Sequence, residues 1–250
     1  MKALILAAGP GTRIQSVHGD RPKCLIRFND SSSTILDHQI KNLFSAGVNN
    51  IGIVVGYEKD QIIRHVATRY GAWRRNFFFI ENPIFARTNN TFSLWLAQTW
   101  LHGEPFICLN ADVVFDPRIL TPAIETTTPI SLIVDSAWRD EATKVIISGD
   151  RIVRMGQRIP QSAFSGSCIG ITTFAAGVQE AFFAKVKKLF RAGKENEVFH
   201  IAVQQLADEG LHVGFAKTGG LPWAEIDDPG DLAFARLYIF PRLVSLPAAA

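Results

Sequence analysis

The stretch Leu-Ile-Leu-Ala-Ala-Gly-Pro-Gly-Thr-Arg at positions 4–13 constrains this chain more than any other part of it. Residues 2–7 form a short, mostly apolar run, which predicts a buried parallel strand. The run leads into Gly9 and Gly11, and glycines let a backbone take positive φ and approach a ligand closely. Successive N–H groups in such a turn form a concavity that binds anions. We therefore expect a strand followed by an anion-binding turn.

Cationic side chains follow this turn and favour phosphate as the anion. Thr12 adds a hydroxyl group, Arg13 a guanidinium, and Lys23, after Pro22, an ammonium. A P-loop is excluded because Gly-x4-Gly-Lys-Ser/Thr is absent, and the dinucleotide fingerprint is excluded because the third glycine is missing. A glycine turn alone is also compatible with a plain tight turn after a core strand. The added hydroxyl and cations favour a triphosphate cradle.

Apolar periodicity predicts an α/β fold for the first half of the chain. Strand-like and helix-like runs alternate at the spacing of βαβ units, which indicates a doubly wound, mostly parallel, Rossmann-like sheet. The expected strands are 2–7, 50–55, 76–80, 105–109 and 130–135, and the expected helices are 34–46, 58–69 and one from Asn89 or Asn90 to about 101. Ligands bind at the carboxyl ends of such strands, where Gly9 and Gly56 would lie.

The second half has a different texture. Short strand-like runs at 144–147, 152–155 and 168–174 are separated by glycine turns, which predicts a small antiparallel subsheet beside the main sheet. Helices are expected at 175–191 and 197–209, followed by a strand at 211–216. We interpret this section as a wall of the site.

Two polar segments follow predicted strands. Asp112 lies just beyond strand 105–109, where a carboxylate can hold Mg²⁺ beside phosphates, although capping the next turn is an alternative. Asn89 and Asn90 open a helix whose N-terminus would attract an anion. A capped core helix with no ligand role would show the same pattern. Far along the chain, Asp227 and Asp228 precede Pro229, which is typical of a helix N-terminus.

These segments together resemble one enzyme family. Leu6-Ala7-Ala8-Gly9-x-Gly11-Thr12-Arg13 followed by Pro22-Lys23-Cys24-Leu25 is similar to the signature of nucleotidyltransferases that make NDP-sugars and CDP-alcohols. Asn89-x-x-x-Ser93-Leu94, Asp112-Val113-Val114 and Glu225-Ile226-Asp227 match later family segments in the same order. Pro10 is a departure, since it stiffens the loop and removes one amide donor. The resemblance covers nearly the whole chain and implies the GT-A-like nucleotidyltransferase fold.

The resemblance also implies residue roles. Arg13 would hold the leaving pyrophosphate, Lys23 would act at the α-phosphate, and Asp112 and Asp227 would bind Mg²⁺, so these four form the expected catalytic set. CTP is the expected nucleotide, because the chain looks closer to the phosphocholine and phosphonate cytidylyltransferase branch. The expected nucleotide-binding residues are Leu6, Ala7, Ala8, Gly9, Gly11, Thr12, Arg13, Lys23, Gly56, Asn82, Asn89, Asn90, Ser93 and Asn110.

The acceptor is expected to be a small phosphonate or phosphorylated alcohol. Arg139 and Lys144 place cations on the expected acceptor wall, which favours a dianionic head group such as that of 2-aminoethylphosphonate. Lys144 is equally compatible with a solvated strand residue. Trp138, Phe164 and Trp223 offer an aromatic cage that would favour phosphocholine, and a sugar 1-phosphate is a further alternative. Gly170, Trp223 and Glu225 complete the expected substrate-binding set.

Composition narrows the remaining classes. The 250 residues carry a net charge of only +3 and scattered basic residues, which argues against nucleic-acid binding. Three separated cysteines and no long apolar run predict a cytoplasmic protein with no disulfide framework and no membrane span. We expect one domain over 1–250, with a nucleotide-binding core (1–135), an acceptor-side insertion (136–220) and a metal-binding segment with a C-terminal helix (221–245).

Two other functions stay open at this point. A catalytically silent nucleotide sensor would lack Lys23 or one of the acids, and all of them are present. A glycosyltransferase that uses an NDP-sugar would show Asp-x-Asp, whereas residues 110–112 are Asn-Ala-Asp. The sequence does not decide the oligomeric state, with a homodimer among the options.

Overall fold

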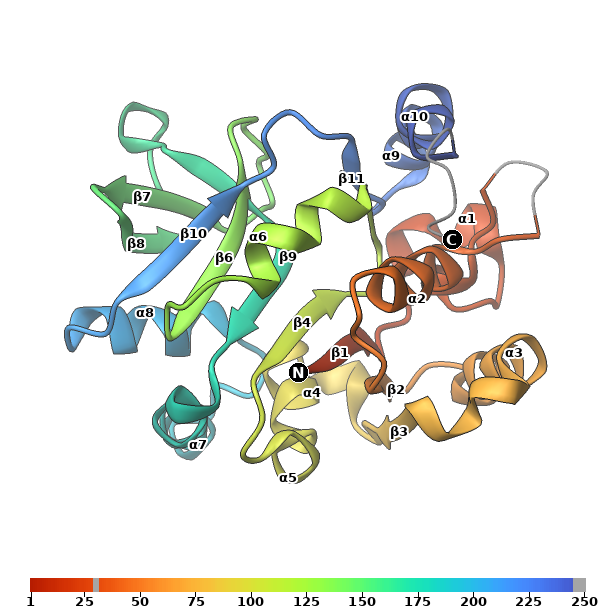
Figure 1. The fold of residues 1–250 in the computed structure, drawn as a ribbon, viewed down its shortest axis with the longest axis horizontal. Helices are drawn as coiled ribbons and strands as arrows, with labels where there is room; N and C mark the ends of the chain where they lie inside the picture. The colour runs from red at the N-terminus through yellow and green to blue at the C-terminus, as the bar shows by residue number, and fades with distance from the viewer. Residues whose placement is uncertain (29–31, 245–250) are drawn as a thin grey trace.

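The computed structural model describes residues 1–28 and 32–244, and its centre is a mixed β-sheet (Figure 1). Seven of its strands lie in the order β10-β6-β9-β4-β1-β2-β3, and β7 and β8 extend the sheet from β9. The strands are β1 (Lys2–Ala7), β2 (Ile51–Val55), β3 (Phe77–Glu81), β4 (Phe106–Asn110), β6 (Ile130–Asp135), β7 (Lys144–Ser148), β8 (Arg151–Gly156), β9 (Gly166–Phe174) and β10 (Val213–Lys217).

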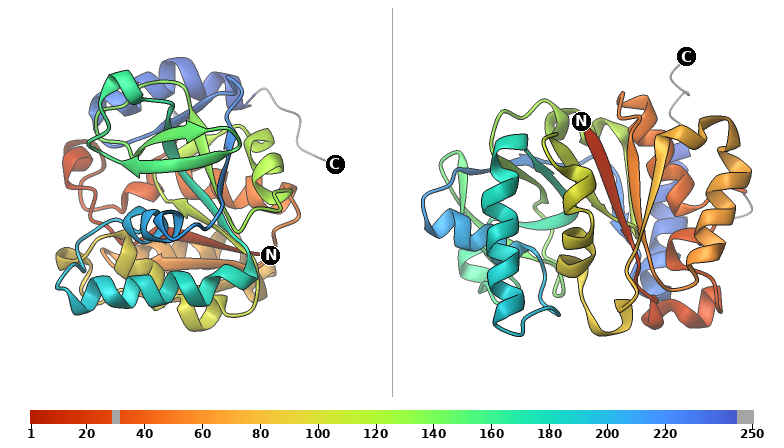
Figure 2. Two further views of the ribbon diagram at one scale, coloured as in Figure 1. Left: turned by 90° about the vertical axis from the view of Figure 1, so that its left-hand side faces the viewer. Right: turned by 90° about the horizontal axis from the view of Figure 1, so that it is seen from below.

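Helices cover both faces of this sheet (Figure 2). They are α1 (Gln15–His18), α2 (Ile35–Ser45), α3 (Lys59–Arg69), α4 (Asn90–Leu96), α5 (Gln98–Leu101), α6 (Leu120–Ile124), α7 (Gln179–Arg191), α8 (His200–Asp208), α9 (Pro229–Phe234) and α10 (Phe240–Val244). Successive side chains of β1 point to opposite faces, as the pleat requires. Leu4 therefore packs in a core with α4, α5, α7 and α8, whereas Ala3 and Ile5 pack in another with α2, α3 and α6.

The strand connections place a crevice beside β1. β1 pairs in parallel with β2 on one side and β4 on the other, with Ala7 opposite Val55 and Leu6 opposite Asn110. The chain therefore moves outward from β1 to β3 and then returns across β1 to form β4. A crevice at the carboxyl ends of the strands forms where the winding direction reverses. The predicted doubly wound, mostly parallel sheet is confirmed.

The third predicted hairpin run differs from its expected position. Residues 168–174 belong to the longer strand β9, which lies inside the main sheet and runs antiparallel to both β4 and β6. Only β7 and β8 form a projecting hairpin, and β7 joins it to β9. β9 is buried along nearly its whole length, so its apolar composition reflects a central strand and not a half-exposed hairpin.

A second, two-stranded sheet joins distant parts of the chain. β5 (Val113–Phe115) pairs antiparallel with β11 (Trp223–Glu225), and Glu225 lies opposite Val113. Both strands are too short to show a periodic pattern, so their pairing was not predicted. This small sheet places residue 227 beside residue 112.

Local helix signals agree with the structure at most ends. Thr34 and Asp37 form a reciprocal capping box at α2, and Asp228 and Asp231 form one at α9. The helix expected from Asn89 or Asn90 to about 101 is two short helices that meet at Ala97. The final segment contains a π-helical turn, Ala235–Ile239, between α9 and α10. Residue 245, the expected end of this segment, lies outside the described residues.

Candidate active site

The glycine turn lies against Lys23. Gly11 has φ of +62°, in the left-handed region that favours glycine, and a Cβ atom there would lie 3.0 Å from the Lys23 Cβ atom. A Cβ atom on Gly56 would lie 2.8 Å from the Ala8 carbonyl oxygen. Gly11 therefore lets the turn close over Lys23. Because Gly56 has no side chain, the Ala8 carbonyl group of the turn can lie close to it.

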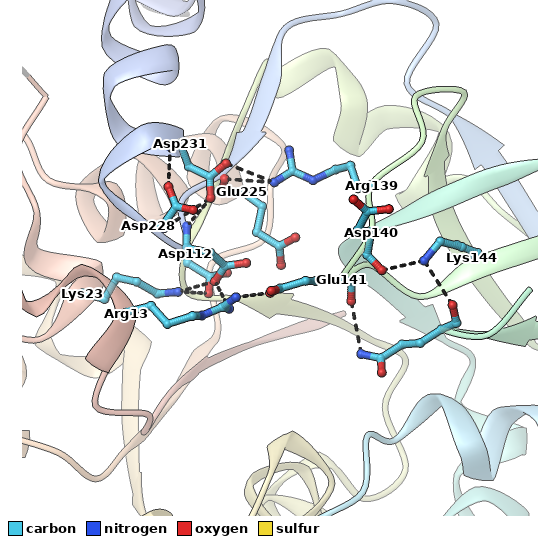
Figure 3. A network of polar contacts seen from close by, with 12 residues as sticks. Arg13, Lys23, Asp112, Arg139, Asp140, Glu141, Lys144, Glu225, Asp228 and Asp231 are labelled. Carbon is cyan, nitrogen blue, oxygen red and sulfur yellow. Dashed lines mark hydrogen bonds and ion pairs between the residues drawn. The ribbon is translucent and has the colours of Figure 1, made fainter. Parts of the chain in front are cut away.

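The Lys23 ammonium joins the two predicted metal-binding acids (Figure 3). Its Nζ atom lies 2.6 Å from Asp112 Oδ2 and 2.9 Å from Asp227 Oδ1. Arg13 approaches from the same loop, with Nη2 3.0 Å from Asp227 Oδ1. The Ile226 N–H donates to the Asp112 carbonyl oxygen at 3.0 Å and continues the β5–β11 ladder. The structure thus brings the four predicted catalytic residues together.

Burial and charge tune this cluster. Burial alone would lower the pKa of Lys23, but the Asp112 and Asp227 carboxylates outweigh it and hold that pKa above its ordinary value. Burial alone would raise the pKa of Asp227, but Lys23 and Arg13 lower it below its ordinary value. Glu225 differs, because burial and the charges of Asp112 and Asp227 raise its pKa to about 8. Lys23 therefore stays charged, and its single positive charge does not neutralise all the acidic side chains of the cluster.

One oxygen of this cluster is unsatisfied. Asp112 Oδ1 is buried and has no hydrogen-bond partner among the described residues. Buried polar atoms in native proteins ordinarily have a partner, so such an atom needs an explanation such as an ion or water. No set of three or more His, Cys, Asp or Glu side chains is arranged as a metal cage in the described part of the chain. The two carboxylates that Lys23 joins, those of Asp112 and Asp227, could hold Mg²⁺, since this ion is commonly held by one or two carboxylates plus substrate oxygens.

A network behind Asp227 sets its position. The Asp231 carboxylate accepts from the backbone N–H groups of Asp227 at 2.9 Å and Asp228 at 3.3 Å. Arg139 lies 3.5 Å from Asp231 Oδ1, and its guanidinium sits 5.4 Å from the centre of the Trp223 ring. Figure 3 shows Arg139 beside Asp231. Arg139 and Trp223 therefore support the segment that carries Asp227, and neither lines the cavities described next.

Three neighbouring cavities surround the cluster. The first, about 130 Å³, lies under the glycine turn, and the second, about 210 Å³, lies between that turn and α4. Leu6, Gly9 and Asp112 line both. The third is about 490 Å³ and shares Asn89, Asn90 and Asn110 with the second. The first two lie beside the glycine turn, and the third extends toward the 136–220 section.

Predicted nucleotide-binding residues line the first two cavities at most positions. They are Leu6, Ala7, Ala8, Gly9, Gly11, Lys23, Asn82, Asn89, Asn90, Ser93 and Asn110. Thr12 and Gly56 are not among the lining residues. Asn82 has a structural task as well, because its amide donates to Thr88 at 3.2 Å and to Ser93 at 3.1 Å. The polar wall of the second cavity is therefore held rigid by its own hydrogen bonds.

The third cavity is lined by several residues that the sequence did not single out. They include Asp140, Glu141, Ala142, Thr143, Gln157, Cys168, Val198 and His200, beside the predicted Arg13, Gly170, Glu225 and Asp227. Asp140-Glu141 is an acidic pair in the predicted wall, and that was the one available signal. The rest converge only through folding. A Cβ atom on Gly170, whose φ is +78°, would lie 2.8 Å from the Asn110 amide nitrogen, so this glycine makes room for Asn110.

Two contacts shape this third cavity. Arg13 and Glu141 form an ion pair across it, although both side chains are largely exposed. His200 is buried, with Nδ1 3.3 Å from Thr143 Oγ1 and Nε2 3.7 Å from Cys168 Sγ. Burial lowers the pKa of His200 to about 4. His200 is therefore neutral near pH 7, and the cavity's charge comes from its carboxylates and Arg13.

Lys144 does not line this cavity, contrary to its expected contact with the acceptor. It is 2% exposed, and its ammonium donates to the carbonyl oxygens of Asp140 at 2.7 Å, Gln157 at 3.1 Å and Ala142 at 3.4 Å. The ammonium also lies 4.8 Å from the centre of the Trp138 ring. The buried cation thus organises the 140–142 loop from behind, and the loop presents its carboxylates to the cavity (Figure 3).

Comparison with known proteins shows sequence similarity to nucleotidyltransferases. A family model described as nucleotidyl transferase matches residues 2–157. A choline-phosphate cytidylyltransferase from Streptococcus pneumoniae is 37% identical over 78% of this chain and 79% of its own length. A CTP:phosphoglutamine cytidylyltransferase from Campylobacter jejuni is 29% identical over 55% of this chain, which spans 54% of that relative. A CMP-5'-(3-aminopropyl)phosphonate synthase from Streptomyces rubellomurinus is 26% identical over 92% of this chain, which spans only 37% of that relative.

Solved structures share the fold. The inositol-1-phosphate CTP transferase from T. maritima superposes with a TM-score of 0.81 at 24% identity, over 100% of this chain and 98% of that one. The CTP:phosphocholine cytidylyltransferase from Streptococcus pneumoniae superposes with a TM-score of 0.73 at 24% identity, over 94% and 97% of the two chains. The predicted fold is confirmed, and cytidylyltransferases are prominent among the named relatives. No helix in the described residues is both long and apolar enough to span a bilayer.

Proposed function

Because the chain belongs to the nucleotidyl transferase family, we propose that it transfers CMP from CTP to a small phosphonate or phosphorylated alcohol and releases pyrophosphate. The observation that carries the proposal is the contact of Lys23 with both Asp112 and Asp227, directly under the glycine turn. CTP is favoured over other nucleotides by the activities named for several relatives.

The reaction needs positioning and charge stabilisation more than proton transfer. An ionised oxygen of the acceptor attacks the α-phosphorus of CTP, the bond from that phosphorus to the bridging oxygen of the β-phosphate breaks, and pyrophosphate departs with the electron pair. No general base is required, because the acceptor oxygen is already deprotonated at neutral pH. Lys23 stabilises charge that develops on the α-phosphoryl oxygens, and Arg13 stabilises the leaving pyrophosphate.

Asp112 and Asp227 are the residues that would hold Mg²⁺. When bound, the ion would supply charge neutralisation and orientation of the phosphate oxygens. The buried, unpartnered Oδ1 of Asp112 supports this assignment, because a bound cation would satisfy it. Lys23 contacts both carboxylates, and Arg13 contacts Asp227 as well.

The acceptor is proposed to be a phosphonate or phosphate that carries an amine, such as 2-aminoethylphosphonate. The basis differs from the sequence interpretation, because Lys144 is buried and Arg139 supports Asp231. The third cavity instead contains the carboxylates of Asp140, Glu141 and Asp227 with one arginine, while Glu225, whose pKa is raised to about 8, is mostly uncharged at neutral pH. An excess of carboxylate favours a cationic head group, while the acceptor's anionic end points toward the α-phosphate beside Lys23.

Phosphocholine is the second candidate, and a sugar 1-phosphate is the third. The S. pneumoniae relative favours phosphocholine by its named activity. The aromatic cage expected for a quaternary ammonium is only partly assembled, because Trp138 already contacts the Lys144 ammonium and Phe164, while Trp223 contacts Arg139. A primary amine needs carboxylates more than aromatic faces, so the cavity favours it.

A pyrophosphate-release screen tests the proposal. The purified chain is incubated with each of the four NTPs and Mg²⁺, and with 2-aminoethylphosphonate, phosphocholine, inositol 1-phosphate or glucose 1-phosphate. We expect release with CTP and the amine-bearing acceptors. Release only with UTP and a sugar phosphate would overturn the CTP proposal. Nucleotide binding without release under any pairing would instead support a non-catalytic nucleotide-binding regulator.

A further inference from the structure

A separate cleft of about 830 Å³ lies between α3 and the segment that follows the glycine turn. One wall is α3, and the other is the segment that follows the glycine turn, including Arg21, Leu25, Arg27 and Thr34. None of its lining residues lines the three active-site cavities. Its volume falls in the range of small-molecule sites, about 300–1,000 Å³.

Both walls of the cleft carry arginines. On α3, Gln61, Arg64, His65 and Thr68 face it, and this spacing places them on one side of a helix. Arg21 and Arg27 face it from the opposite wall, and Arg69 lies at the end of α3. In the described part of the chain, no side-chain hydrogen bond or ion pair holds Arg21 or Arg64. Two guanidiniums on facing walls are therefore available to a ligand.

A buried carboxylate holds part of the cationic wall in place. Asp37 is fully buried, and its Oδ1 atom lies 3.0 Å from His65 Nε2 and 3.3 Å from Arg69 Nε. The Tyr70 hydroxyl donates to the same oxygen at 2.9 Å, and the Thr34 N–H donates to Oδ2 at 2.9 Å. His65 and Arg69 are thus oriented before any ligand arrives. Such preorganisation lowers the entropic cost of binding.

The two ends of the cleft differ in charge. Glu58 and Asp60 lie at the start of α3, and Arg64 and Arg69 lie one and two turns further along. Arginine forks bind phosphate oxygens through paired hydrogen bonds, whereas carboxylates accept hydrogen bonds from hydroxyl or amino groups. A matching ligand therefore carries a phosphate at one end and hydroxyl or amino groups at the other.

We propose that this cleft is a second ligand site, which binds a phosphomonoester of about the size of a nucleoside monophosphate. One backbone segment connects the cleft to the catalytic centre. Arg21 lies two residues before Lys23, and Leu25 ends the 3₁₀ turn Lys23–Leu25 that carries the catalytic lysine. Occupancy of the cleft is thus positioned to affect the active site.

Calorimetric titration with AMP tests this proposal, with adenosine as the ligand that lacks a phosphate. Arg27→Ser/Arg64→Ser removes one guanidinium from each wall, and Arg74→Ser/Arg75→Ser removes two exposed arginines outside the cleft. Lys23→Ala serves as the variant with an impaired active site. We expect the cleft variant to raise the Kd for AMP about tenfold or more, since two charged hydrogen-bonding groups are lost. The Arg74/Arg75 control and Lys23→Ala should keep the wild-type Kd, and adenosine should not bind.

Three results would overturn the proposal: no AMP binding by the wild-type chain, equal binding by the cleft variant, or binding lost in Lys23→Ala but kept in the cleft variant. The last result would place AMP in the active site. If Arg27→Ser/Arg64→Ser does not fold, Arg64→Gln alone tests the same site, because Arg64 is exposed on α3. A folded Arg64→Gln variant with an unchanged Kd for AMP would equally reject the cleft.

Discussion

Two lysines, the half-buried Lys23 and the buried Lys144, lie in different parts of the site and have different partners. Lys23, on the nucleotide side, contacts the carboxylates of Asp112 and Asp227. Lys144, on the acceptor side, contacts three backbone carbonyl oxygens and no carboxylate among the described residues. Both follow short loops and both were expected to meet substrate. Only Lys23 lines a cavity of the active site.

The difference lies in the partner atoms. A lysine between two carboxylates can exchange one partner for a phosphate oxygen, because the ligand supplies the same kind of charge. A lysine that satisfies three carbonyls in the interior cannot turn outward without leaving those carbonyls unpaired, which is costly. A cationic side chain in a predicted site is therefore a candidate for ligand binding only when the ligand can replace the groups that it contacts in the folded protein.

Replacing Lys23 by alanine should have the largest effect. We expect turnover to fall on the order of 10²–10³-fold, as for loss of a preorganised group that stabilises transition-state charge. Steady-state pyrophosphate release measures it, and the Tm of the variant serves as the control for folding. A folded Lys23→Ala protein with wild-type turnover would show that the two lysines do not differ in the proposed way.

Lys144→Met should lower the free energy of unfolding more than it affects catalysis. It removes the donor for three carbonyls, and we expect a loss of about 2–4 kcal/mol in the free energy of unfolding. Chemical denaturation measures this loss, and pyrophosphate release at saturating acceptor measures any effect on kcat. If Lys144 instead bound the acceptor, the KM for acceptor would rise sharply with no change in unfolding.

Lowering the pH should reduce the stability of the protein through His200, which lines the third cavity. Its pKa is about 4 in the folded protein and 6.5 in the reference state, so the unfolded chain binds more protons between these values. The stability contribution is complete above pH 6.5 and is lost as the pH falls toward 4, by at most about 3 kcal/mol. His200→Gln should flatten this part of the stability–pH curve.

His38 in α2 also has its pKa lowered to about 4 by burial. His38 is present in both the wild type and the His200→Gln variant, so its contribution cancels in the difference between their free energies of unfolding. Unfolding free energies measured at pH 7, 6, 5 and 4 give the two slopes. Identical slopes for wild type and His200→Gln would contradict the neutral, buried state of His200.

Glu141→Gln should have the smallest effect. Glu141 holds Arg13 across the third cavity, and the proposed role of Arg13 is to bind the leaving pyrophosphate. Removing this competing charge should lower the KM for CTP by about twofold to fivefold, a small change because exposed ion pairs are weak. Initial rates over a CTP series measure it, and Glu180→Gln on α7 is a control distant from the site. A raised KM for CTP would show that Glu141 helps nucleotide binding.

Much of the nucleotide side was predictable because its signals are local. The strand 2–7, the turn at Gly9 and Gly11, the cap at Thr34 and the position of Asp112 after β4 all follow from neighbouring residues. Parallel strands place their carboxyl ends at one edge, so Gly9 and Asn110 had to lie close together.

The acceptor side was less predictable because it depends on contacts between distant segments. Asp140, Glu141 and His200 meet only because β9 enters the main sheet and α8 packs behind the β7–β8 hairpin. The burial of Lys144 also depends on this packing, since a lysine on a short strand gives no local sign of its partners. The separate cleft beside α3 escaped prediction for the same reason: its arginines come from two segments.

Local sequence signals were sufficient to predict the longer strands and helices, their order and the chemical character of the glycine turn, because backbone propensity and side-chain periodicity operate over a few residues. Which charged side chains lie close together depends on the tertiary structure. Three residue pairs of the β5–β11 ladder bring Asp227 to Asp112, and that pairing, set by long-range packing, gives Lys23 its two partners.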